Sequence, residues 1–92
     1  MYISLIRYKN KKTGKKYRFL AFVIGDSEDK IYCLKSSYLN DLDVLLLKNN
    51  IDNLKKLSPE KVIEWCKKHI AGYKKAYRGI SKKNCLVEKR YK

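Results

Sequence analysis

The chain has 92 residues, of which 45% are hydrophobic, and its 23 Lys and Arg outnumber 9 Asp and Glu to give a formal charge of +14. This length supports one hydrophobic core, so residues 1–92 are expected to form a single domain. The apolar content excludes a wholly disordered chain, and no apolar run is long enough to span a membrane. The first residues lack a charged leader and a cleavage site, which favours a cytoplasmic protein over a secreted one.

Residues 1–35 have the pattern of an antiparallel meander of three strands. The first, over residues 2–9, places Ile3 and Leu5 on one face and Tyr2, Ile6 and Tyr8 on the other. A Gly-containing hairpin connection over residues 10–16 leads to the second strand, over residues 17–25, whose nearly continuous apolar run is typical of a central strand. A polar turn and a third strand over residues 30–35 follow.

Residues 36–79 are expected to form helices. Ser36 or Ser37 can cap a first helix, whose leucines recur at helical spacing until Asn49 and Asn50 end it. A short amphipathic turn follows over residues 51–57. The segment Ser58-Pro59-Glu60 then predicts the start of one long helix over residues 59–78, with Gly79 as its C-terminal cap.

That long helix has two distinct faces in projection. Its apolar face contains Val62, Ile63, Cys66, Ile70, Tyr73 and Tyr77, and its opposite face contains Lys61, Lys67, Lys68, Lys74, Lys75 and Arg78. His69 falls at the rim of the apolar face, and Trp65 lies off its centre. An apolar face of this width predicts that the helix packs against the sheet.

Residues 80–92 form a basic C-terminal segment in which residues 85–87 can add a short strand. The sequence therefore predicts an α+β fold: a small antiparallel sheet of three strands, or four, from the N-terminal half, with two main helices packed on one face. A meander with a basic ribbon followed by a helix is similar in outline to the small three-stranded DNA-binding domains of some integrases. That likeness covers about the first half of the chain and includes no diagnostic motif.

The three cysteines, Cys33, Cys66 and Cys85, are expected to be small buried hydrophobic residues in a reducing compartment. They are widely spaced, no CxxC pair occurs, and the single histidine has no second ligand nearby in sequence. The sequence therefore predicts neither a metal site nor a cofactor.

The positive charge is concentrated at the two ends of the chain. Residues 1–25 carry seven basic and no acidic side chains, residues 26–60 carry five and seven, and residues 61–92 carry eleven and two. Such clusters repel themselves unless an anion is bound, which favours a polyanionic partner. Lys outnumbers Arg by 19 to 4, which favours contact with phosphates over reading of bases.

We therefore expect a small protein that binds DNA or RNA through the phosphate backbone, with little sequence preference. The candidate binding residues come from the hairpin, the basic helix face and the C-terminal segment: Arg7, Lys9, Lys11, Lys12, Lys15, Lys16, Arg18, Lys67, Lys74, Arg78, Lys82, Lys83 and Arg90. Tyr8, Tyr17 and Tyr91 are candidates for stacking on bases.

Two alternatives use the same features. A small accessory or inhibitor protein of a virus or mobile element would dock the basic face on an acidic protein. A metal-dependent nuclease would use the acidic turn of Asp26, Glu28 and Asp29, although the sequence contains no recognisable catalytic motif and favours a protein that is not an enzyme. Pairing of two copies through an exposed sheet edge or Trp65 would enlarge the basic surface in either case.

Overall fold

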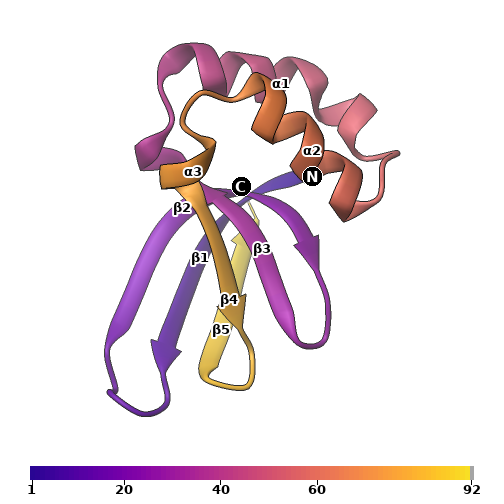
Figure 1. Cartoon of the computed structure of the whole chain (residues 1–92). Helices are drawn as coiled ribbons and strands as arrows, with labels where there is room; N and C mark the ends of the chain where they lie inside the picture. Colours follow the sequence, from indigo (N-terminus) through magenta and orange to yellow (C-terminus); the bar gives the residue numbers. More distant parts are fainter. Residues whose placement is uncertain (92) are drawn as a thin grey trace.

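The computed structural model describes residues 1–91, and the side chains of residues 1–88. The elements in chain order are β1 (Tyr2–Asn10), β2 (Lys16–Asp26), β3 (Lys30–Lys35), the short 3₁₀ helix η1 (Ser36–Tyr38), α1 (Asp41–Leu54), α2 (Pro59–His69), α3 (Tyr73–Ala76), β4 (Tyr77–Ser81) and β5 (Cys85–Tyr91). Figure 1 shows the helices gathered at one end of the strands.

The strands form one antiparallel sheet of five in the order β4-β3-β2-β1-β5, with β2 at its centre. The central position of β2 follows from its apolar run. The prediction of a sheet of three strands, or four, was wrong. The meander of β1, β2 and β3 is correct, but β4 and β5 extend it on opposite sides.

The sheet is strongly curled. β4 and β5 occupy opposite edges, yet only residues 82–84 join them. In a flat sheet these edges would lie about 19 Å apart, whereas the link from Ser81 to Cys85 reaches at most about 14 Å. A register shift between Val23 and Gly25 marks a bulge that bends β2. The curl brings the β1–β2, β2–β3 and β4–β5 connections together at the end opposite the helices (Figure 1).

Each face of the sheet has its own hydrophobic core. The outer face, which includes Phe22 and Leu34, packs against the helices around Leu47 and Cys66. The inner face is enclosed by the curl of the sheet, and its buried side chains are Ile6, Ala21, Val23, Ile31, Cys33, Ile80 and Cys85. The alternation of faces expected for the first strand is therefore confirmed, and the second and third strands alternate in the same way. Helices cover only one face, and the sheet covers the other itself.

The first helix differs from its prediction at both ends. Ser36 and Ser37 lie in η1, and α1 begins at Asp41 because Asn40 caps it by accepting a 2.7 Å hydrogen bond from the amide of Asp43. The helix continues through Asn50, whose side chain donates to the carbonyl of Leu46 at 2.7 Å. The polar asparagine pair therefore did not end the helix, and α1 runs to Leu54.

The expected single helix over residues 59–78 is also wrong. α2 ends at His69, a turn follows, and α3 extends only from Tyr73 to Ala76 before the chain enters β4. The amides of Ala71 and Gly72 donate to the buried carboxylate of Asp43, each at 3.1 Å. These two bonds to α1 replace helical bonds. None of the helices among the described residues is long and apolar enough to cross a membrane.

Candidate functional site

The lysine-rich loop between β1 and β2 has a defined conformation built by its polar residues. The side-chain oxygen of Asn10 accepts from the amides of Lys12 at 2.8 Å and Thr13 at 3.1 Å. Gly14 adopts a φ of +71°, a conformation that glycine reaches without strain. The loop thus exposes Lys11, Lys12 and Lys15 on a fixed backbone.

Four basic side chains are aligned on the outer face of the β1–β2 hairpin. Arg7 lies opposite Arg18, and Lys9 lies opposite Lys16, so two rows of cations cross the strands. β5 continues the first row with Glu88 and the second with Leu86. The four cations are exposed. The two rows border a groove of about 480 Å³.

We call this groove the basic groove. A third row of paired residues lies between the two rows of cations and also lines the groove. It consists of Val87, Tyr8 and Tyr17. Since side chains alternate between faces along a strand, this middle row contributes its backbone to the floor. The groove therefore combines four cations with one carboxylate.

The inner side of the same hairpin carries aromatic rings. Tyr8 and Tyr17 are stacked, with centroids 4.7 Å apart and planes inclined by 15°. Phe19 meets Tyr8 edge to face at 6.1 Å. The ammonium of Lys15 lies 5.7 Å from the centroid of the Tyr17 ring. Tyr17 is exposed, whereas burial is the main cause that raises the pKa of the half-buried Tyr8.

The series of contacts continues beyond the hairpin to η1 and β4. The ammonium of Lys35 lies 5.4 Å from the ring centroid of Phe19 and 5.2 Å from that of Tyr38. The guanidinium of Arg78 lies 5.3 Å from the same Tyr38 ring. We call the whole series the aromatic–cation ladder; its members are Lys15, Tyr17, Tyr8, Phe19, Lys35, Tyr38 and Arg78.

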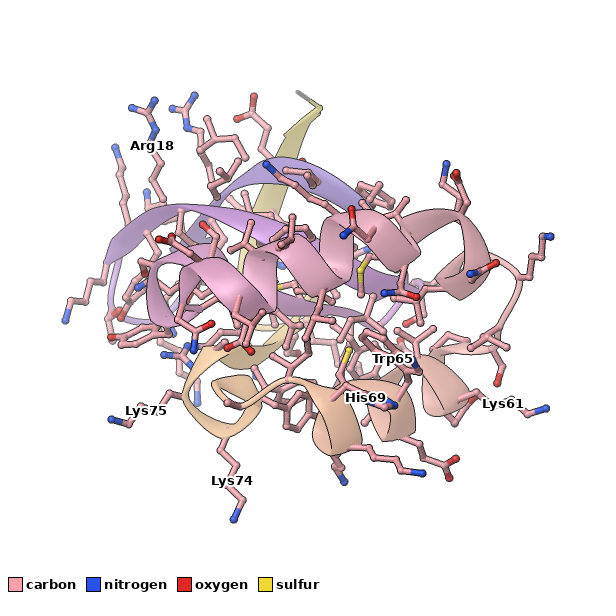
Figure 2. The ribbon with its side chains drawn as sticks, turned by 90° about the horizontal axis from the view of Figure 1, so that it is seen from above. Arg18, Lys61, Trp65, His69, Lys74 and Lys75 are labelled. Carbon is pink, nitrogen blue, oxygen red and sulfur yellow. The ribbon has the colours of Figure 1, made fainter. Side chains whose placement is uncertain are left out.

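The basic residues of the helices lie away from the hairpin. Figure 2 shows Lys61, Lys74 and Lys75 on the side of the molecule opposite Arg18. Lys67 and Lys74 line a second groove, of about 550 Å³, at the end of α2. The two basic regions expected from the sequence are therefore not brought together.

The other basic residues that the sequence predicts to bind nucleic acid differ in the contacts they make within the protein. The guanidinium of Arg78 donates to the carbonyls of Lys75 and Tyr77, both at 2.7 Å. Lys82 forms an ion pair with Asp26 at 2.6 Å, so its charge is partly neutralised. Lys83 is exposed in the β4–β5 turn, which accepts a bond from the amide of Lys11. The side chains of Arg90 and Tyr91 lie outside the described residues.

The described residues do not supply the metal site that a metal-dependent nuclease would need. Among the described residues, no group of three or more His, Cys, Asp or Glu side chains could hold a metal ion. Cys66 is buried, and this burial raises the pKa of its thiol to about 11. His69 is exposed and packs against the Trp65 ring at 4.8 Å (Figure 2). The thiol of Cys66 is therefore protonated at neutral pH.

Sequence reasoning missed three members of the ladder, Phe19, Lys35 and Tyr38, and assigned Arg78 to a helix face. Tyr38 follows β3 by three residues and meets Arg78 only because β4 pairs with β3. No local pattern signals such a contact. Comparison of the chain with protein-family models, with curated proteins and with solved structures gave no match.

Proposed function

We propose that this protein binds nucleic acid through the phosphate backbone, using the basic groove together with the lysines of the β1–β2 loop. The observation that carries the proposal is the alignment of Arg7 with Arg18 and of Lys9 with Lys16. Like charges directly opposite each other destabilise a sheet. Phosphates bound between the rows would neutralise these charges, so the same arrangement that costs stability favours a polyanion.

The basic groove suits phosphate better than the groove beside α2. Lys67 and Lys68 occupy the last turn of α2, where the helix dipole is negative. Cations placed there stabilise the helix, but the dipole opposes a bound anion. In contrast, the cations of the basic groove project from strands, whose net dipoles are small.

We further propose that the protein works in the cytoplasm. Its three cysteines are free and buried, which is typical of proteins in a reducing compartment. Binding should be weak at physiological salt, with a dissociation constant on the order of 10⁻⁴–10⁻⁶ M.

The test is fluorescence anisotropy of labelled DNA and RNA at several salt concentrations. In one variant, Arg7, Lys9, Lys16 and Arg18 are all changed to Gln. Each lost phosphate contact lowers the slope of log affinity against log salt by about 0.7 to 0.9. We therefore expect this variant, which loses four cations, to lose up to about 2.8 to 3.6 units of slope.

A matched control removes the same number of positive charges from the helices: Lys61, Lys67, Lys68 and Lys74 are changed to Gln. Its slope should remain close to that of the wild type, because none of these four side chains lines the basic groove. Equal losses in both variants would mean that net charge alone drives binding. No binding at low salt would overturn the proposal in favour of an acidic protein partner.

A further inference from the structure

The aromatic–cation ladder lies beside an open stretch of β2. Among the described residues, pairing of β2 with β3 begins only at Ala21, so Lys16 to Leu20 have β1 as their strand partner and no strand on their other side. Tyr17 lies in this stretch between two cations of the basic groove, Lys16 and Arg18. A ligand strand that follows the groove can therefore reach the ladder over this edge.

Two rings of the ladder are partly exposed to solvent. Tyr17 is 39% exposed although Tyr8 is stacked on its ring and the ammonium of Lys15 lies over it, and Tyr38 is 46% exposed although Lys35 and Arg78 lie over its ring. These cations are the ends of long side chains, which a base can displace. Both rings are held in place: Tyr17 by its stack on Tyr8, and Tyr38 by the cations of Lys35 and Arg78. A ring already held in place loses little freedom when a partner stacks on it.

The chemistry of the ladder selects one kind of ligand. Aromatic rings bind the flat faces of bases, and cations beside them bind phosphates. In a duplex, neighbouring base pairs cover these faces, whereas in a single strand they are accessible. None of the ladder's seven members is acidic, so a phosphate meets no like charge among them.

We propose that the ladder binds an unpaired stretch of DNA or RNA, with one base stacked on Tyr17 and another on Tyr38. The proposal rests on the proposed function and narrows it, because it names single strands as the ligand. It also gives Tyr8 a supporting role beneath Tyr17.

The experiment compares a labelled single-stranded oligonucleotide of about 12 residues with its duplex, a length within the range that stacking surfaces bind. We expect the single strand to bind more tightly. Tyr17→Leu and Tyr38→Leu should each weaken single-strand binding about tenfold. Tyr17→Phe and Tyr38→Phe, which keep the ring, should bind as the wild type does. The salt slope should be the same in all four variants, since no cation is removed.

The outcomes separate this proposal from the one on which it rests. Binding with a steep salt slope, but equal for duplex and single strand and unchanged in the Leu variants, would overturn the ladder and leave the basic groove in place. No binding of either ligand would overturn both.

A second measurement guards against variants that do not fold. A wild-type complex with a bromouracil-substituted single strand is irradiated, and the crosslinked residues are identified by mass spectrometry. Crosslinks at Tyr17 or Tyr38 support the proposal. Crosslinks confined to other residues would reject it.

Discussion

Asp43 illustrates how one buried carboxylate can hold distant segments together. It lies in the first turn of α1, where an acidic side chain interacts favourably with the helix dipole and is usually exposed to solvent. Instead its side chain is 2% exposed and accepts two amide bonds from a turn 28 and 29 residues away. These bonds fix the start of α3, which leads directly into β4.

We expect Asp43→Ala to lower the free energy of unfolding by about 2–4 kcal/mol, because it leaves the amides of Ala71 and Gly72 without their charged acceptor. Urea unfolding measures this change. Asp41→Ala is the control: Asp41 is exposed in the same helical turn, and its loss should cost less than about 1 kcal/mol. Equal costs for the two variants would show that the bonds to the turn add no stability.

At the scale of elements, the break between α2 and α3 decides the fold. The apolar stripe from Val62 to Tyr77 suits a continuous helix, and a single glycine opposes it by only about 1 kcal/mol. The break occurs because Gly72 lies against another segment. A β-carbon at this position would lie 2.7 Å from the carbonyl oxygen of Tyr38 and 3.2 Å from the carboxylate of Asp43.

Gly72→Ala therefore distinguishes the two arrangements by the sign of its effect. In a continuous helix, alanine would stabilise the protein by about 1 kcal/mol. In the observed turn we expect a loss of about 1–3 kcal/mol, because a backbone oxygen must move.

The thermal midpoint of each variant measures the Gly72→Ala effect. Gly79→Ala is the matched control, since its new carbon would have its nearest neighbour at 3.6 Å, an ordinary contact. A rise in midpoint for Gly72→Ala would contradict the turn.

At the scale of the whole molecule, two cores lie on opposite faces of one sheet, and each contains a buried cysteine whose pKa is raised. Burial raises the pKa of Cys33, in the core inside the curled sheet, to about 12. Burial likewise raises the pKa of Cys66, in the core beneath the helices, to about 11. Cys33 also donates a weak hydrogen bond to the carbonyl of Arg78 at 3.7 Å. The pKa of Cys33 therefore reports on burial in the inner core, and that of Cys66 reports on burial beneath the helices.

These pKa values predict a loss of stability at high pH. Below about pH 9 the thiols are protonated in both the folded and unfolded states, so their contribution is constant. Above that pH the unfolded chain releases protons that the folded protein retains. Stability should then fall by about 1.4 kcal/mol per thiol for each pH unit, until the pH passes about 11 for Cys66 and about 12 for Cys33.

Urea midpoints measured between pH 8 and the alkaline limit of the folded state test this dependence. Cys33→Ala and Cys66→Ala should each remove the pH-dependent loss of stability that one thiol causes. Tyrosines and lysines titrate in the wild type and in the variants alike, so their effect cancels when the two are compared. A double variant carries both Cys33→Ala and Cys66→Ala. If the wild type lost no more stability at high pH than this double variant, the thiols would not be buried as described.

The face alternation of the first three strands, the central position of β2 and the basic hairpin could all be predicted from the sequence. Each depends on residues close together along the chain: a period of two in the apolar residues, an Asn and a Gly in the loop, and charges on neighbouring positions. The placement of Arg7, Lys9, Lys16 and Arg18 along one groove follows from the same local register.

Only the tertiary structure decided where the helix breaks, that β4 and β5 lie at opposite edges, and that Tyr38 and Arg78 join the rings of the hairpin. Each depends on a contact between residues far apart in sequence, such as the bonds from Ala71 and Gly72 to Asp43. Local propensity is too weak to resist such contacts. For that reason the sequence by itself determined the hairpin and its charge, while the curl of the sheet determined which rings stand beside that charge.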